Sequence, residues 1–356
     1  MGDKRNPGFF DIEERAEKLA LMGDRLVALN SHIDWEAFRG DLGRVYEKPR
    51  KSSAGAKPID VVLMFKVLIL QQLHNLSDDG IEYQIRDRLS FMRFLGLQIE
   101  DRVPDAKTIW LFRERLKSAD LINVLFARFH EQLSAQGYVA RAGQIIDATF
   151  VEVPRQRNSR AENAQIKEGQ TPDDWKQPES KAKLRQKDVD ARWTKKNGVN
   201  HYGYKNHVNV DHANKLIQCF EVTDAAVHDS MLFDDLVDQE CQEDGNKRAV
   251  YADSAYRSKE RESQLAHAGI PSAICEKGTS NCPLNDAQKE MNRTKSKVRA
   301  RVEHVFGAQA QMGGHFVRTI GLLRARLKIG MMNLVYNMVR LTQLRRRNGK
   351  VASTAA

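Results

Sequence analysis

The stretch GQIIDATFVEV, residues 143–153, is where the sequence changes from a helical to an extended pattern. It is short, apolar and rich in β-branched residues, which is typical of a β-strand. One acid, Asp147, stands inside this run. Because an isolated charge is expensive to bury, an acid in this position calls for a partner or a chemical role.

The chain after this strand alternates between strand and helix patterns. Strands are predicted at residues 202–211, 215–225, 247–256 and 270–277, and helices at 228–242, 258–269 and from about 286 onward. The order is therefore β-β-β-α-β-α-β-α, which predicts an α/β fold with helices on the faces of a mixed sheet. In this topology Asp253, in VYADSAY, lies at the end of the fourth strand, and the first and fourth strands can lie side by side.

The chain before this strand reads as helical throughout. Pro58 opens the most apolar segment, IDVVLMFKVLILQQL, which predicts the central helix of a bundle. We therefore expect a helical N-terminal domain over 1–140, an α/β domain over 141–340 with a polar insertion or loop at 155–200, and a basic, disordered tail over 341–356.

Composition limits the class of protein. The chain has 356 residues, 41% of them hydrophobic, and a formal net charge of +10, which excludes collagen-like and wholly disordered proteins. No apolar run approaches the roughly 20 residues needed to span a bilayer, and the N-terminus does not resemble a signal peptide. The four cysteines show no CxxC spacing. They predict reduced core residues of a cytoplasmic protein that has no membrane partner.

The positive charge is concentrated at the end of the chain. The last 64 residues contain 14 Lys and Arg and one acid, Glu303. Such a block predicts a surface for a polyanion, and nucleic acid is the commonest one in this compartment. The candidate DNA contacts are Arg293, Lys295, Lys297, Arg299 and Arg301. For the cluster around 345–350, a solvated tail is as good an interpretation.

Two further residues are weaker candidates for DNA contacts. Lys205 lies in a predicted strand, where its side chain faces either DNA or the sheet. Trp193 lies in a polar segment, where a tryptophan either stacks on an unpaired base or, more commonly, pins a loop to the protein.

Three acids form a candidate catalytic set: Asp147, Asp253 and Glu303. Carboxylates brought close together repel one another unless they are protonated or hold a divalent cation. Oxygen ligands without His or Cys select Mg²⁺ or Mn²⁺, and two such ions support phosphodiester chemistry. Taken singly, an Asp at a strand end is usually a turn former or a helix cap, and Glu303 is usually explained as the partner of Arg299 at i,i+4. The joint occurrence of all three acids in this strand order, beside a cationic block, favours the catalytic interpretation.

The motifs IIDAT, VYADSAY and RARVEHVFG together resemble the DDE transposases of bacterial insertion sequences, in particular the InsH-type group. The resemblance extends from Pro58 to Arg340. It implies a ribonuclease-H-like core in which Asp147 and Asp253 are the two catalytic aspartates and Glu303 is the glutamate. Arg299 matches the arginine of a Tyr-Arg-Lys signature found in related groups, whereas Ser296 and Ala310 stand at the Tyr and Lys positions.

The resemblance implies the activity. Such an enzyme uses Mg²⁺, with Mn²⁺ as a substitute, to hydrolyse a phosphodiester at each end of its element, and the freed 3′-OH attacks target DNA. Two ends imply a homodimer on double-stranded DNA, located at the nucleoid. The domain over 141–340 is then the catalytic one. The helical domain over 1–140 is the natural candidate for DNA-end binding and dimerisation, with 107–117 as either a groove-reading helix or bundle packing. No nucleotide cofactor is expected, in keeping with the lack of a GxxxxGK[ST] loop.

Other functions were weighed against this one. A nuclease of the same fold that does not transpose, and a catalytically silent DNA-binding protein, stay open as alternatives. An HNH nuclease built from His201, Asn206 and His207 is disfavoured because the spacing is wrong. His228, Asp229 and Ser230 are interpreted as a helix cap.

Overall fold

The structure is a computed structural model that describes residues 11–47, 57–138, 142–243, 245–279 and 281–354. It divides into two compact units, one of Met1–Gln132 with Met338–Ala356 and the other of Leu133–Asn337. The tail predicted to be disordered is instead part of a helix, α16 (Leu322–Thr354). Leu341 and Leu344 are buried, because apolar residues continue at helical spacing beyond the expected boundary. Among the described residues, no helix has the length and apolarity to span a membrane.

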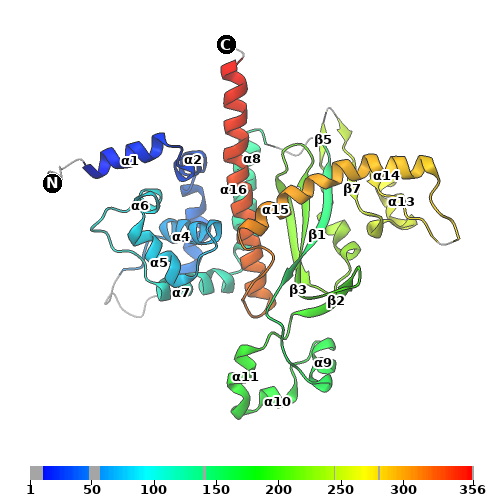
Figure 1. The fold of residues 1–356 in the computed structure, drawn as a ribbon, viewed down its shortest axis with the longest axis horizontal. Coiled ribbons are helices and arrows are strands. Elements are labelled where there is room, and N and C mark those ends of the chain that lie inside the picture. The colour runs from blue at the N-terminus through cyan, green and yellow to red at the C-terminus, as the bar shows by residue number, and fades with distance from the viewer. Residues whose placement is uncertain (1–10, 48–56, 139–141, 244, 280, 355–356) are drawn as a thin grey trace, which may run out of the picture. The chain divides into compact units, whose positions relative to one another are not determined.

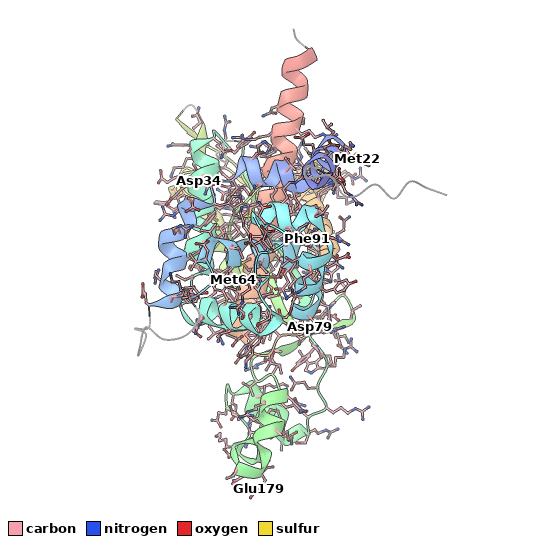
Figure 2. The ribbon with its side chains drawn as sticks, turned by 90° about the vertical axis from the view of Figure 1, so that its left-hand side faces the viewer. Met22, Asp34, Met64, Asp79, Phe91 and Glu179 are labelled. Carbon is pink, nitrogen blue, oxygen red and sulfur yellow. The ribbon has the colours of Figure 1, made fainter. Side chains whose placement is uncertain are left out.

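The first unit is helical, as predicted. Its central helix is α4, in which ten of thirteen residues are buried, and Asp60 caps it by accepting hydrogen bonds from Val62 N and Leu63 N. Met64 is fully buried whereas Met22 is 84% exposed, and Figure 2 shows both. The helices and short 3₁₀ turns of this unit before α8 are α1 (Asp11–Leu21), α2 (Arg25–His32), η1 (Glu36–Phe38), α3 (Arg39–Gly43), η2 (Arg44–Tyr46), α4 (Val61–Leu73), α5 (Asp78–Asp87), α6 (Leu89–Leu95) and α7 (Ala106–Ser118). Helix α8 (Ile122–Ala135) runs from the first unit into the second.

The second unit is built on a six-stranded mixed sheet (Figure 1). Its path is β2-β3-β1-β7-β8, and β4 also pairs with β3. The pairs β1–β3 and β3–β4 are antiparallel, whereas β1–β7 and β7–β8 are parallel. The strands are β1 (Gln144–Glu152), β2 (Arg192–Lys196), β3 (Val199–Asp211), β4 (Ile217–Asp224), β7 (Val250–Ala252) and β8 (Ser272–Ile274). The five predicted strands are therefore present, with the last two shorter than expected.

The helix predicted over 228–242 is shorter than expected. It consists of the 3₁₀ turn η4 (Asp229–Leu232) and α12 (Phe233–Leu236), followed by a small hairpin of β5 (Gln242–Glu243) and β6 (Asn246–Lys247). The Gln144 side chain donates to Asp238 O and accepts from Asp238 N. Asn209 Nδ2 donates to Leu236 O. These bonds hold the backbone beyond Leu236 outside the helix.

The segment 155–200, predicted as a polar insertion or loop, is largely ordered secondary structure. It forms a helical lobe of α9 (Arg160–Lys167), α10 (Asp173–Lys176), η3 (Pro178–Ser180) and α11 (Lys181–Gln186), followed by strand β2. Ser159 and Glu162 form a capping box at the start of α9. Trp175 is fully buried, and its indole N–H donates to Glu162. This aromatic core, hidden from a composition-based analysis, explains why the lobe folds.

The two faces of the sheet carry different layers. One face packs on the hydrophobic cluster that includes Ile146, Phe233 and Ala252, between the sheet, α12 and α13 (Lys259–His267). On the other face, Asn206 exchanges hydrogen bonds with Asn333 of α16 (2.9 and 3.0 Å). The remaining helices of the unit are α14 (Asp286–Arg299) and α15 (Glu303–Gln311), joined by the 3₁₀ turn η6 (Ala300–Val302).

Candidate active site

Asp147 lies in β1, and Asp253 directly follows the end of the neighbouring strand β7. In the parallel pair of β1 and β7, Ile145 is opposite Tyr251. Two residues further along each chain are Asp147 and Asp253, and because side chains alternate along a strand, both project to the face opposite the Ile146 cluster. The two carboxylates interact electrostatically. The convergence predicted from strand order is therefore present for these two acids.

Arg299 lies against this pair. It occupies the last turn of α14, and its Nη1 donates to Asp147 Oδ2 over 2.7 Å. The other Asp147 oxygen, Oδ1, accepts the backbone N–H of Ala148 over 2.8 Å. Arg299 is also attracted by Asp253. The guanidinium thus supplies positive charge beside Asp147 and within electrostatic range of Asp253.

The electrostatics of the site favour a cation. Burial raises the pKa of Asp147 to about 6, with a smaller upward contribution from Asp253, against the lowering effects of Arg299 and the Ala148 N–H. For Arg299, burial alone lowers the pKa, but Asp147 and Asp253 together raise it above its ordinary value. Ionised Asp147 is therefore costly here, and charge compensation is incomplete.

Glu303 begins α15, one turn after Arg299, and is exposed. Its side chain forms no hydrogen bond or ion pair with any residue in the described part of the chain. Within the described ranges, no group of three or more His, Cys, Asp or Glu side chains is assembled to hold a metal ion. The structure thus brings together Asp147 and Asp253, and leaves Glu303 outside that pair.

Tyr256 was missed by the sequence analysis. It is 1% exposed, in the 3₁₀ turn η5 (Ser254–Tyr256) that Asp253 caps by accepting from Ala255 N. Its buried hydroxyl has no hydrogen-bond partner among the described residues. Burial, and then Asp147, Asp229 and Asp253, raise its pKa. The aromatic residue three positions after Asp253 in VYADSAY was the available signal.

The basic residues of the α14 segment differ in their availability. Arg293 is exposed and pairs with Glu290, and Lys297 is exposed. Lys295 Nζ donates to Ile274 O, and Arg301 Nη1 donates to His212 O. Arg293, Lys297 and Arg301 therefore present charge to solvent, whereas Lys295 and Arg299 are turned toward the sheet.

Lys205 is not available as predicted. It is 6% exposed, its Nζ lies 2.7 Å from Asp229 Oδ1, and it donates to Val227 O. Burial opposes ionisation of Asp229, but Lys205, with smaller contributions from Lys196 and His207, outweighs burial and lowers the pKa of this carboxyl. Lys205 thus holds the start of η4 to β3, and only His228 caps that turn as expected of the His-Asp-Ser motif. Because Asn206 and His207 project to opposite faces of β3, they do not form an HNH site.

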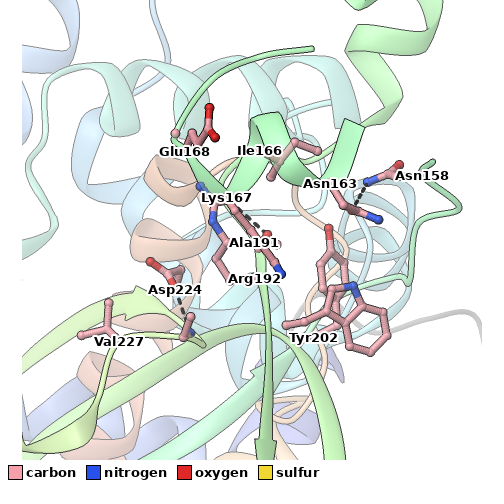
Figure 3. A pocket seen from close by; sticks show the side chains of 13 residues that line it. Asn158, Asn163, Ile166, Lys167, Glu168, Ala191, Arg192, Tyr202, Asp224 and Val227 are labelled. Atoms are coloured by element: carbon pink, nitrogen blue, oxygen red, sulfur yellow. Dashed lines mark hydrogen bonds between the residues drawn. The ribbon is translucent and has the colours of Figure 1, made fainter. Parts of the chain in front are cut away.

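Trp193 lines a pocket that does not include Asp147 or Asp253. It is 44% exposed, its ring lies 4.9 Å from that of Tyr202, and Arg155 stands over it. Both aromatic residues line a pocket of about 910 Å³ between α9 and the ends of β2, β3 and β4, where Figure 3 shows Ile166 across from Tyr202. Val208 of β3 is the sheet partner of Asp147. Tyr202 lies six residues before Val208, so the pocket is about 20 Å along β3 from Asp147.

Asp147 of β1 and Asp253 after β7, with Arg299 of α14 against Asp147, are the two acids and the cation that the structure brings together. Residues 140–338 match the family described as "Transposase DDE domain", and residues 13–115 match "Transposase domain (DUF772)". The chain belongs to the DDE transposases, of the insertion-sequence type, and is a DNA transposase. A solved structure similar to it is "Cryo-EM structure of piggyBac transposase synaptic complex with hairpin DNA (SNHP)", at 12% identity and a TM-score of 0.44, covering 88% of this chain and 74% of that one.

Proposed function

We propose that this transposase cleaves and joins DNA strands with the carboxylates of Asp147, Asp253 and Glu303, in a ribonuclease-H-like core. The single observation that carries this proposal is the shared face of Asp147 and Asp253 with a guanidinium against them. The sheet supports it as well. Its path β2-β3-β1-β7-β8, with β4 also paired to β3, combines antiparallel pairs with the parallel pairs β1–β7 and β7–β8, as expected for such a core.

Asp147 and Asp253 fit a hard divalent cation. They offer only carboxylate oxygen as a ligand. The guanidinium of Arg299 already provides a positive charge at Asp147 Oδ2, where a cation would bind. These two residues would hold Mg²⁺ or Mn²⁺, and Glu303, which is free of side-chain partners among the described residues, would complete a second site. Metal held by these residues would supply activation of a water or a 3′-OH and stabilisation of the leaving oxygen.

The chain's own residues supply the rest. Arg293, Lys297 and Arg301 present charge beside the carboxylates and would hold the backbone of double-stranded DNA. Trp193, half exposed at the pocket of Figure 3, would contact DNA farther from the cut. The joining step exchanges one phosphodiester for another and so conserves bond energy. Coordinated action on two ends supports a homodimer, in which the helical domain would bind the element ends.

The test compares Asp147→Asn, Asp253→Asn and Glu303→Gln in a strand-cleavage and strand-transfer assay on element-end DNA with Mg²⁺. Each variant should slow both reactions by at least about a thousandfold, because the substitution removes a negative charge needed for catalysis. The Kd for the same DNA should change by no more than a few fold, because the DNA-binding surface is unchanged. The surface variant Asp234→Asn is the matched control.

Three results would revise the proposal. Wild-type strand transfer by any one variant would remove that acid from the set. Cleavage without transfer would indicate a nuclease. DNA binding with neither reaction, unaffected by the substitutions, would indicate a silent DNA-binding protein.

A further inference from the structure

The contact between Arg299 and Asp147 occupies the oxygen that a metal would need. Of the two Asp147 oxygens, Oδ1 accepts the Ala148 N–H and Oδ2 accepts Arg299 Nη1. The Asp147 side chain is 10% exposed and that of Arg299 is 28% exposed. A cation that binds Asp147 through Oδ2 therefore has to displace the guanidinium or share the oxygen with it.

The guanidinium itself is held weakly elsewhere. Its Nε is buried and has no hydrogen-bond partner among the described residues. Asp147 is the one hydrogen-bonded side-chain partner found for it there. Arg299 also lies at the end of α14, where the helix gives way to the 3₁₀ turn η6. Its long side chain is thus free to exchange Asp147 for another anion without breaking a second bond.

We propose that Arg299 is a placeholder cation, which neutralises Asp147 while no metal is bound and is released to a DNA phosphate when the metal enters. This inference rests on the proposed function and assigns Arg299 a role in metal loading. As a consequence, Arg299 and the metal compete for Asp147 Oδ2. Removal of Arg299 should therefore tighten metal binding in the absence of DNA while weakening the hold on DNA.

The experiment is a Mn²⁺ titration of the full-length chain without DNA, with free Mn²⁺ followed by electron paramagnetic resonance. It is run at about pH 8.5, above the pKa of about 6 of Asp147. We expect Arg299→Gln to bind Mn²⁺ about tenfold more tightly than the wild type, since a charge-assisted hydrogen bond no longer has to be broken. Arg293→Gln removes an equivalent charge from the same helix without touching Asp147, and should leave Mn²⁺ affinity within twofold.

The outcomes separate the two proposals. Mn²⁺ binding that Asp147→Asn abolishes but Arg299→Gln fails to tighten would overturn the placeholder role and leave the proposed function standing. A gain in both Arg→Gln variants would overturn it as well, because general charge would then be the cause. If neither the wild type nor Arg299→Gln bound Mn²⁺ through Asp147, both proposals would fall. Thermal unfolding of each variant, with and without Mn²⁺, confirms that folded protein is compared.

Discussion

The buried carboxyl of Asp147 predicts that the candidate active site destabilises the folded protein above the pKa of this group. Burial lifts the pKa of this group from its ordinary value of 3.8 to about 6. Since each tenfold change in proton affinity is worth about 1.4 kcal/mol, the ionised group costs about 3 kcal/mol more in the folded chain than in the unfolded one. The side chain is only 10% exposed, so solvent does not screen most of this cost.

The sign follows from which state binds the proton more tightly. Between about pH 4 and pH 6 the folded chain keeps the proton that the unfolded chain has released. Stability is therefore full below about pH 4, falls as the pH rises through about 6, and is lowest above it. Asp147→Asn, which is uncharged at every pH, should match the wild type near pH 4 and exceed its stability by up to about 3 kcal/mol at pH 8.

Urea denaturation followed by circular dichroism, in EDTA at pH 4.5, 6 and 8, measures this difference. Asp234→Asn, which removes an exposed acid, should show no such pH dependence. Added Mg²⁺ should stabilise the wild type and not Asp147→Asn, because a ligand of the folded state raises its stability by mass action. The reasoning is refuted if Asp147→Asn is less stable than the wild type at pH 8, or if the gap between them is independent of pH.

Three further predictions concern structure and DNA binding. Asn206→Leu should cost about 2–4 kcal/mol in urea denaturation, because it removes the partner of Asn333 Nδ2 and of Gln309 Oε1. The double variant with Asn333→Leu should lose less than the sum, and full additivity would contradict this. Glu162→Ala removes the partner of Ser159, Trp175 and Lys183 and should expose 155–190 to limited proteolysis while the sheet stays folded; an unchanged digest would argue against it. Replacing Arg345–Arg347 with Gln should reduce the slope of log Kd against log salt by about two to three, and an unchanged slope would mean that this segment does not touch DNA.

The approach of Asp147 and Asp253 to each other could be predicted from the sequence, because the strand patterns show where each acid stands. Asp147 and Asp253 each stand at a known place relative to an apolar run, and pairing of those runs brings them together. A strand pattern does not show which helices and turns pack on the sheet. The Lys205–Asp229 pair and the buried Tyr256 hydroxyl depend on how η4 and η5 cross the sheet. The helical lobe depended on one buried tryptophan, Trp175, within a segment whose composition resembles a loop.

The face on which Glu303 lies could not be predicted from the sequence either. On a continuous α-helix, residues four apart are offset by about 40° around the axis, so Arg299 and Glu303 would share a face. The intervening residues form the 3₁₀ turn η6. Because a 3₁₀ helix advances about 120° per residue, the offset grows to about 100°. This turns the carboxylate of Glu303 away from the face that presents Arg299 to Asp147.

Spacing in the sequence cannot distinguish an α-helical turn from a 3₁₀ turn, since the choice is made by packing. For Glu303 to act with Asp147 and Asp253, as we propose, η6 must rewind toward α-helix or the long Glu303 side chain must reach around it. A structure with element-end DNA and Mg²⁺ should therefore show a changed turn at 300–302 and the Glu303 carboxylate beside the two aspartates. If that carboxylate stays at the surface in such a complex, the third acid of the site is another residue.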